Sequence, residues 1–138
     1  MLLTKRSYSH DVATGDVVRL KDRADLMTVE AVHQETFGPV LDCIWFDSED
    51  GLRYRRFPVS QTDIFPRPAP MNGGLSVGLE VRLRSRGPVM TVRALTTRDG
   101  VPFAQCVWTG ALNRERRRLF PVETLVLSIL ERFEGEGA

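Results

Sequence analysis

The sequence predicts an all-β protein made of two tandem SH3-like small β-barrels followed by a C-terminal amphipathic α-helix. Three observations support this fold class: an internal repeat, alternating apolar residues within each copy, and turn dipeptides between the alternating runs. A shift of 63 residues aligns the two halves without a gap. We therefore expect a first barrel at residues 1–66, a linker at 67–77, and a second barrel with the helix at 78–138.

The repeat is clearest in four pairs of segments, which are listed here with their partners 63 residues later. They are Gly15–Leu20 with Gly78–Leu83, Met27–Val29 with Met90–Val92, Cys43–Trp45 with Cys106–Trp108, and Phe57–Val59 with Phe120–Val122. Self-similarity at a fixed period indicates that one folding unit has been duplicated.

Each copy contains four runs with the period of two that a half-buried strand requires. The fourth runs span about 52–57 and 115–120, and Asp50-Gly51, Gly87-Pro88 and Asp99-Gly100 predict turns. Four or five strands of this length can protect their edges by curling into a small barrel, and we predict five strands in each copy. The predicted core consists of equivalent residues in the two copies: Val18, Leu20, Met27, Val29, Cys43, Trp45 and Phe57, and Val81, Leu83, Met90, Val92, Cys106, Trp108 and Phe120.

The C-terminal residues depart from the repeat and predict a helix. Apolar residues recur there with helical spacing, at Val122, Leu125, Val126, Ile129, Leu130 and Phe133. Pro121 suits the first helical position, and Gly135 suits the end. A short helix is marginal alone in water, so we expect its apolar stripe to cover an end of the barrels or to form a homodimer contact.

Composition and charge bound the functional classes. The chain has 42% apolar and 27% charged residues, which is typical of a folded protein and not of a disordered one. No apolar run approaches the roughly 20 residues needed to cross a bilayer, so we expect a cytoplasmic protein with no membrane contact. Residues 1–66 carry 8 basic and 11 acidic side chains, whereas residues 67–138 carry 11 and 7. The acidic first copy and basic second copy are therefore expected to attract each other.

The repeated residues also carry a family resemblance. Gly15 to Lys21, Met27 to Val29, Cys43 to Phe46 and Phe57-Pro58 form a pattern that resembles the YodC-like family of small bacterial proteins. The second copy matches at Arg86 to Val92, at Cys106 to Trp108 and at Phe120-Pro121. The resemblance implies compact SH3-like barrels and brings no assigned activity. This chain departs from the family by its duplication and by Ala24-Asp25, which stand where the pattern has Gly-Pro.

The reactive residue types do not form a catalytic or metal-binding pattern. Cys43 and Cys106 share a strand face with the tryptophans, so we interpret them as buried structural residues. His10 and His33 have no cysteine or second histidine at ligand spacing, and we expect both to be solvated surface residues. No phosphate-binding glycine loop or nucleophile–base arrangement is evident. We therefore expect a protein that is not an enzyme and has no cofactor or metal.

An arginine cluster in the second copy is the feature with functional content. Between Arg82 and Arg118 the chain has nine arginines against Asp99 and Glu115. A planar guanidinium suits carboxylate or phosphate, so these arginines predict an anionic partner, although a solvated polar face is the simpler alternative. The candidate binding residues are Arg82, Arg84, Arg86, Arg93, Arg114, Arg116, Arg117 and Arg118.

Two kinds of partner fit this cluster. The first is a protein with an acidic surface, bound by an adaptor or inhibitor, because arginine is enriched at protein interfaces. The second is nucleic acid, bound through the same face. Against nucleic acid, the isoelectric point of about 7.8 lies below the basic range that is usual for such proteins, and both tryptophans are expected to point inward. We favour the protein partner, with the chain a monomer or a homodimer through its C-terminal helix.

Overall fold

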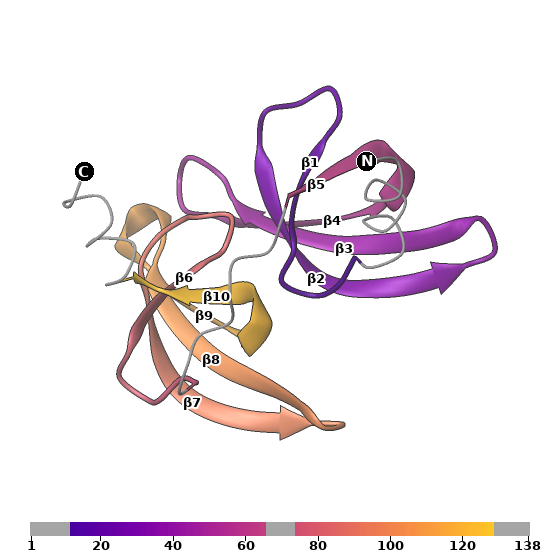
Figure 1. Cartoon of the computed structure of the whole chain (residues 1–138). Helices are drawn as coiled ribbons and strands as arrows, with labels where there is room; N and C mark the ends of the chain where they lie inside the picture. The colour runs from indigo at the N-terminus through magenta and orange to yellow at the C-terminus, as the bar shows by residue number, and fades with distance from the viewer. Residues whose placement is uncertain (1–11, 66–73, 129–138) are drawn as a thin grey trace, which may run out of the picture.

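The computed structural model describes residues 12–65 and 74–128, and within them it is all-β, as predicted (Figure 1). Two five-stranded antiparallel sheets follow one another along the chain and share no strand. Most of the predicted linker, as well as His10 and the end of the predicted helix, lies outside the described residues.

The first sheet has the strand order β4-β3-β2-β1-β5. Its strands are β1 (Val17–Leu20), β2 (Leu26–Glu35), β3 (Gly38–Phe46), β4 (Leu52–Pro58) and β5 (Thr62–Phe65), with the 3-10 turn η1 (Val59–Gln61) before β5.

The second sheet repeats this order as β10-β6-β7-β8-β9. Its elements are β6 (Glu80–Leu83), β7 (Met90–Arg98), β8 (Val101–Thr109), the 3-10 turn η2 (Ala111–Asn113), β9 (Glu115–Pro121), the 3-10 turn η3 (Val122–Thr124) and β10 (Leu125–Leu127). Residues that pair between its strands lie 63 positions after the residues that pair in the first sheet.

The prediction of closed SH3-like barrels is wrong. In each sheet the strands at the two ends of the order do not pair with each other, so the sheets are open. In the first sheet the unpaired edges are β4 and β5, and in the second they are β9 and β10. A sheet can avoid closure when one of its faces is covered by another part of the protein, and here residues of the first sheet cover the core of the second.

The predicted C-terminal helix is also absent from the described residues. Its first turn is the 3-10 turn η3, where the Thr124 hydroxyl donates a hydrogen bond to the Pro121 carbonyl at 2.7 Å. The next residues form β10, which places Leu125 opposite Leu83 at the edge of β6. The open edge of β6 offers backbone partners that outweigh the local helical spacing. Residues 129–138 lie outside the described residues, and the homodimer contact that we expected there stays a prediction.

A β-bulge interrupts the alternation in the long hairpin of each repeat. The register shifts between Val29 and Ala31 in β2, and between Val92 and Ala94 in β7. A bulge adds one residue to one strand and changes the direction of its side chain. Val29 pairs with Cys43 and Ala31 with the adjacent Asp42, so Val29 and Ala31 lie on opposite faces of the sheet. Glu30, between them, accepts a hydrogen bond from Arg118 of the second repeat.

Each sheet has its own apolar core, and the two cores differ in a systematic way. All seven predicted core residues of the second repeat are buried. In the first repeat Leu20 and Trp45 are only partly buried and pack against the cluster from its side, whereas Trp108 is 7% exposed. The two tryptophans therefore occupy non-equivalent environments, contrary to the symmetric prediction.

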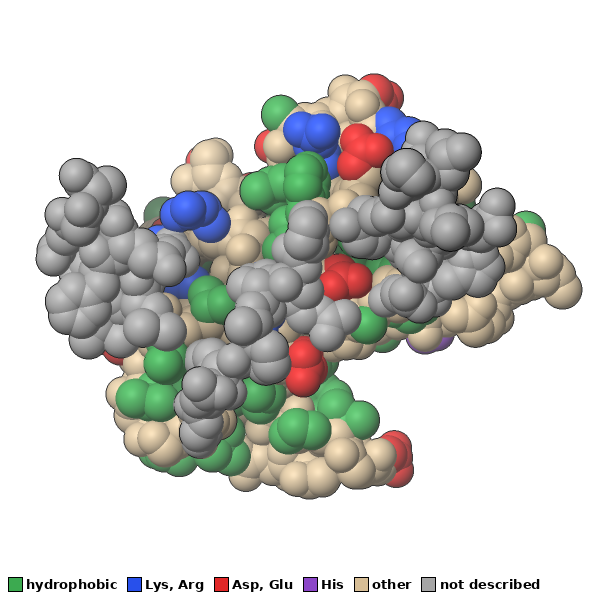
Figure 2. All heavy atoms as spheres, in the orientation of Figure 1, with side chains coloured by type: hydrophobic (Ala, Val, Ile, Leu, Met, Phe, Trp, Pro, Cys, Tyr) green, Lys and Arg blue, Asp and Glu red, His purple; other side chains and the backbone are tan. Residues whose placement is uncertain are grey.

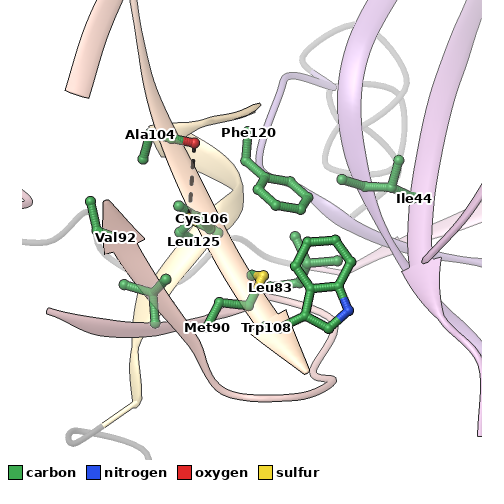
Figure 3. Packing of buried hydrophobic residues seen from close by; sticks show 10 residues of the cluster. Ile44, Leu83, Met90, Val92, Ala104, Cys106, Trp108, Phe120 and Leu125 are labelled. Atoms are coloured by element: carbon green, nitrogen blue, oxygen red, sulfur yellow. Dashed lines mark hydrogen bonds between the residues drawn. The ribbon is translucent and has the colours of Figure 1, made fainter. Parts of the chain in front are cut away.

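The asymmetry arises because the first sheet covers the core of the second. Ile44 lies on the outer face of β3 and is fully buried in the second core (Figure 3). The partly buried Phe46 and Leu52 pack against the same cluster. Phe46 meets Trp108 edge to face, with ring centroids 5.2 Å apart and planes at 82°. This arrangement is the favourable one for two aromatic quadrupoles.

Polar contacts hold the same interface in register. The Thr28 hydroxyl donates to the Ser85 hydroxyl at 2.6 Å and accepts from the Ser85 backbone N–H at 2.9 Å. The Trp108 indole N–H donates to the Asp50 carbonyl at 3.2 Å. Buried polar groups destabilise a fold unless they are paired, and these pairs satisfy groups on both sheets.

Two glycines allow the close approach of the repeats. Gly87 has a φ of +130°, and an added Cβ there would collide with the ring of Phe46. Gly15 has a φ of +98°, and a Cβ there would lie 2.5 Å from the carbonyl oxygen of Glu123. Glycine therefore serves both backbone conformation and packing at these positions.

We expect that Phe46→Ala lowers the free energy of unfolding by about 2–3 kcal/mol, because it removes a partly buried ring from the second core. Thr109 occupies the equivalent position 63 residues later and is exposed, so Thr109→Ala serves as the matched control with a change below about 0.5 kcal/mol. Urea unfolding of both variants measures the difference. Equal effects would contradict the one-sided packing.

Candidate functional site

A groove lies where the first sheet meets the second, and arginines dominate its walls. Its volume is about 440 Å³. The first repeat contributes Asp47, Asp50, Gly51, Leu52 and Arg53, and the second contributes Trp108, Ala111, Arg116, Arg117 and Arg118. At the right of Figure 1 the tips of the β2–β3 and β7–β8 hairpins lie apart, and Figure 2 shows an open notch between them.

Strand β9 positions the arginines of the second repeat. Arg116 pairs with Trp108 and Arg118 pairs with Cys106 across the β8–β9 ladder, so both start from the face that carries the core. Neighbouring residues in a strand point to opposite faces, which places Arg117 on the other side. The run of three arginines therefore does not form one face, although all three reach the groove.

Arg118 holds the two repeats together. It donates to both carboxylate oxygens of Glu30, at 2.7 and 3.0 Å, and its guanidinium lies 5.1 Å from the centroid of the Phe120 ring. The two side chains are 32% and 18% exposed, so this bidentate pair is partly shielded from water. The expected attraction between the acidic and basic copies thus has one specific contact within the chain.

The other two arginines are more available to a partner. Arg117 donates to Glu115 at 3.0 Å in an exposed ion pair, an arrangement that contributes little to stability. Arg116 is exposed and makes no hydrogen bond or ion pair within residues 12–65 and 74–128. Its guanidinium is therefore the group in the groove most accessible to an added anion.

The remaining predicted binding residues do not line this groove. Arg84 lies after β6, and its Nε donates to the Glu123 carbonyl at 2.6 Å. Arg93 lies at the bulge of β7, and Arg114 precedes β9. Arg82 belongs to β6 and Arg86 to the turn that follows it. The structure therefore divides the predicted arginine face into several separate sites.

The first repeat adds residues that the sequence analysis missed. Arg53 occupies the position equivalent to Arg116, and its Nε donates to Asp47 at 2.9 Å. Backbone N–H groups of Gly51 and Glu49 hold the pKa of Asp47 below its usual range, with a further contribution from Arg53. The repeat alignment contained this signal, because Arg53 aligns with Arg116 and Arg55 with Arg118.

An exposed apolar residue stands beside the groove in η2. Leu112 is 85% exposed and has a φ of +60°, and Asn113 follows with a φ of +57°. A left-handed backbone is unfavourable for leucine, and such conformations cluster at binding and catalytic sites. Ala111, next to Leu112, lines the groove.

A second polar cluster lies on the outer face of the first sheet. Asp42 accepts hydrogen bonds from His33 Nε2 at 2.6 Å, from Arg56 Nε at 2.8 Å and from the Tyr54 hydroxyl at 3.0 Å. Burial opposes the charge of Asp42, but these hydrogen bonds, led by Arg56, together lower its pKa. His33 is partly exposed, as expected. Its ring is held by Asp42, a partner that the sequence did not indicate.

The cysteines are buried and free, which confirms the structural interpretation. Burial raises the pKa of Cys43 to about 12, with a smaller contribution from the nearby charge of Asp42. Burial alone raises the pKa of Cys106 to about 12. Because the thiolate is the reactive form, both thiols are inert in the folded chain near neutral pH.

The described residues contain no group of three or more histidine, cysteine, aspartate or glutamate side chains that could hold a metal ion. No helix in the same part of the chain is long and apolar enough to cross a membrane. The expected cytoplasmic location stays a prediction.

Comparison with known proteins adds no identification. The chain matches no protein-family model and no curated protein sequence. The resemblance to the YodC-like family therefore stays a prediction.

We expect Asp42→Asn to lower the free energy of unfolding by about 1–2 kcal/mol at pH 7, since a charged acceptor is lost. The folded-state pKa of Asp42 lies below the ordinary value of 3.8, so its charge stabilises the fold above that pH. The stabilisation is lost as the pH falls through the folded-state pKa. The difference between the variant and the natural chain should therefore shrink below about pH 4 in urea unfolding experiments. Glu49→Gln, an exposed acid of the same repeat, is the control, and an equal pH dependence for it would contradict this account.

Proposed function

We propose that the chain is a non-enzymatic binding module of the adaptor or inhibitor type, which engages the acidic surface of a protein partner through the groove between its repeats. The observation that carries this proposal is the convergence of Arg116 and Arg117 from β9 with Arg53 from β4 in one groove. Arginine binds carboxylates with two parallel hydrogen bonds, and an anion is the ligand that such a groove favours.

The charges of the groove favour carboxylates presented in a defined arrangement. Arg53 and Arg117 are each already paired with one acid, whereas Arg116, which lines the same groove, is exposed and has no acid partner in the described residues. An incoming carboxylate binds Arg116 directly and competes with Glu115 for Arg117. Asp47 and Asp50 on the opposite wall repel acids that lie out of place, which gives the groove selectivity.

Leu112 supplies an apolar contact next to these charges. Protein interfaces combine a few buried apolar or arginine anchors with a polar rim. The exposed Leu112 side chain and the exposed Arg116 together provide both elements on one side of the molecule. This combination supports a protein partner more than a uniform polyanion.

Nucleic acid binding through the same basic face is the second candidate. The arginines suit phosphate as well as carboxylate. Trp108, the aromatic residue in the groove, is 7% exposed and engaged with Phe46, so it offers no face for base stacking. The two aspartates in the groove also oppose a continuous phosphate backbone.

The direct test is affinity capture from host lysate with and without nuclease, using the double variant Arg116→Glu, Arg117→Glu. We expect a nuclease-resistant protein to be captured by the natural chain, and its affinity to fall by about 100-fold in the variant, because two charge-assisted contacts become repulsive. Arg118 is left unchanged because it joins the repeats through Glu30.

The matched control is Arg93→Glu, Arg98→Glu, which makes the same charge change at exposed positions of β7 outside the groove. This control should retain the partner, and both double variants should unfold within about 0.5 kcal/mol of the natural chain. Equal capture by the groove variant would rule out the groove, and a catch lost on nuclease treatment would favour nucleic acid.

A further inference from the structure

The first repeat contains an open pocket, lined by both apolar and charged residues, whose equivalent in the second repeat is filled. The pocket has a volume of about 210 Å³. Met27, Trp45, Arg55 and Phe57 form its base and wall, and the turn after β1 completes the rim with Leu20, Asp22, Arg23 and Asp25. Its existence explains why Trp45 is only half-buried.

In the second repeat the same positions are Met90, Trp108, Arg118 and Phe120, and the first repeat occupies them. Phe46 packs on Trp108, and Ile44 joins the cluster from the neighbouring sheet (Figure 3). Glu30 supplies the carboxylate that binds Arg118. The site in the second repeat is therefore filled by an aromatic ring, that of Phe46, and by a carboxylate, that of Glu30, which binds the arginine. We expect the open pocket to accept a ligand with the same two groups.

The arginine of the open pocket is arranged like its occupied counterpart. Arg55 lies 5.6 Å from the centroid of the Phe57 ring, and Arg118 lies 5.1 Å from that of Phe120. Arg118 is held by Glu30, whereas Arg55 is exposed and makes no ion pair or hydrogen bond with the described part of the chain. The open pocket thus presents the partly exposed Trp45 and an arginine with no partner in the described residues, on a rim that also carries Asp22, Arg23 and Asp25.

A candidate occupant with this chemistry stands at the tip of the β2–β3 hairpin. Phe37 is 72% exposed in the two-residue turn between Glu35 and Gly38. Glu35, the last residue of β2, is also exposed. The equivalent tip in the second repeat is Asp99-Gly100, which has no aromatic residue. The unfilled pocket and the exposed phenylalanine therefore occur in the same repeat.

Phe37 cannot enter the pocket of its own chain. The tip and the pocket lie at opposite ends of one hairpin, since β3 runs from Gly38 at the tip to Trp45 and Phe46 at the pocket. At about 3.3 Å per residue, this separation is on the order of 20 Å. The occupant must come from a second molecule.

We propose that two copies of this chain associate through their first repeats, each inserting Phe37 into the Trp45 pocket of the other and placing Glu35 against Arg55. A two-fold axis makes the contact reciprocal, so the tip of each hairpin meets the base of the other and the assembly closes as a dimer. This surface is separate from the groove between the repeats, so the dimer and the proposed function stand or fall independently.

Sedimentation equilibrium of the full chain tests the dimer. We expect the average mass to rise from 15.6 kDa toward twice that value as the concentration approaches about 1 mM. Phe37→Ala should weaken the association by at least about tenfold, because the ring that fills the pocket is lost. Leu95→Ala, which removes an exposed leucine of the second repeat outside the groove, should leave the association unchanged.

Charge reversal tests the pairing of Glu35 with Arg55. Glu35→Arg and Arg55→Glu should each be monomeric alone at concentrations where the natural chain dimerises. An equimolar mixture of the two variants should form a dimer again, because the two reversed side chains then face each other in one contact and the natural Glu35–Arg55 pair forms in the other. Arg98→Glu, an exposed reversal elsewhere, should dimerise normally.

Three results would overturn the proposal. The natural chain could stay monomeric up to about 1 mM. Phe37→Ala could dimerise as well as the natural chain, which would place the contact on another surface. The mixture of the two reversed variants could stay monomeric, which would separate Glu35 from Arg55. Near-natural unfolding curves for all the variants would establish that each result reflects association and not loss of the fold.

Discussion

The insertion of Ile44 and Phe46 into the core of the second repeat is the constraint on which the rest of the structure depends. Their side chains extend from the outer face of β3, whereas Leu41 and Cys43 of the same strand point into the first core. Strand β3 therefore contributes to both cores, one on each of its faces. The edge-to-face contact of Phe46 with Trp108 fixes where the second sheet lies, and the neighbouring hydrogen bonds from Thr28 and Trp108 fix its register. Because the first sheet covers the core of the second in this way, the second sheet buries its apolar face without closing on itself.

Sequence differences between the two copies explain why side chains of the first repeat enter the core of the second and not the reverse. The positions that present Ile44, Phe46 and Leu52 in the first repeat carry Val107, Thr109 and Glu115 in the second. The second repeat therefore receives apolar side chains from the first and presents no equivalent set. The same differences shape the proposed binding surfaces. Arg118 is used to bind Glu30, which leaves Arg116 and Arg117 for an outside anion, and the first repeat keeps an unfilled pocket.

Much of the fold was predictable from the sequence because it is encoded locally. Alternation located β4 and β9, and apolar character identified buried residues such as Val18, Val29 and both cysteines. The errors concern non-local pairing. Leu125 and Val126 have helical spacing, yet the open edge of β6 recruits them as a strand, and alignment with β5 (Thr62–Phe65) contained this information. At the site, charge identified Arg116 and Arg117, but charge alone could not reveal that Arg118 binds within the chain or that Arg53 joins the groove.

The central claim, that the first repeat covers Trp108 and leaves Trp45 uncovered, is tested most directly by hydrogen exchange of the two indole N–H groups in dilute solution. The Trp108 indole donates to the Asp50 carbonyl and lies under Phe46, whereas Trp45 borders an open pocket. The account predicts that the Trp108 indole exchanges at least about 100-fold more slowly than that of Trp45, because exchange requires separation of the repeats. Equal exchange rates for the two indoles would contradict it.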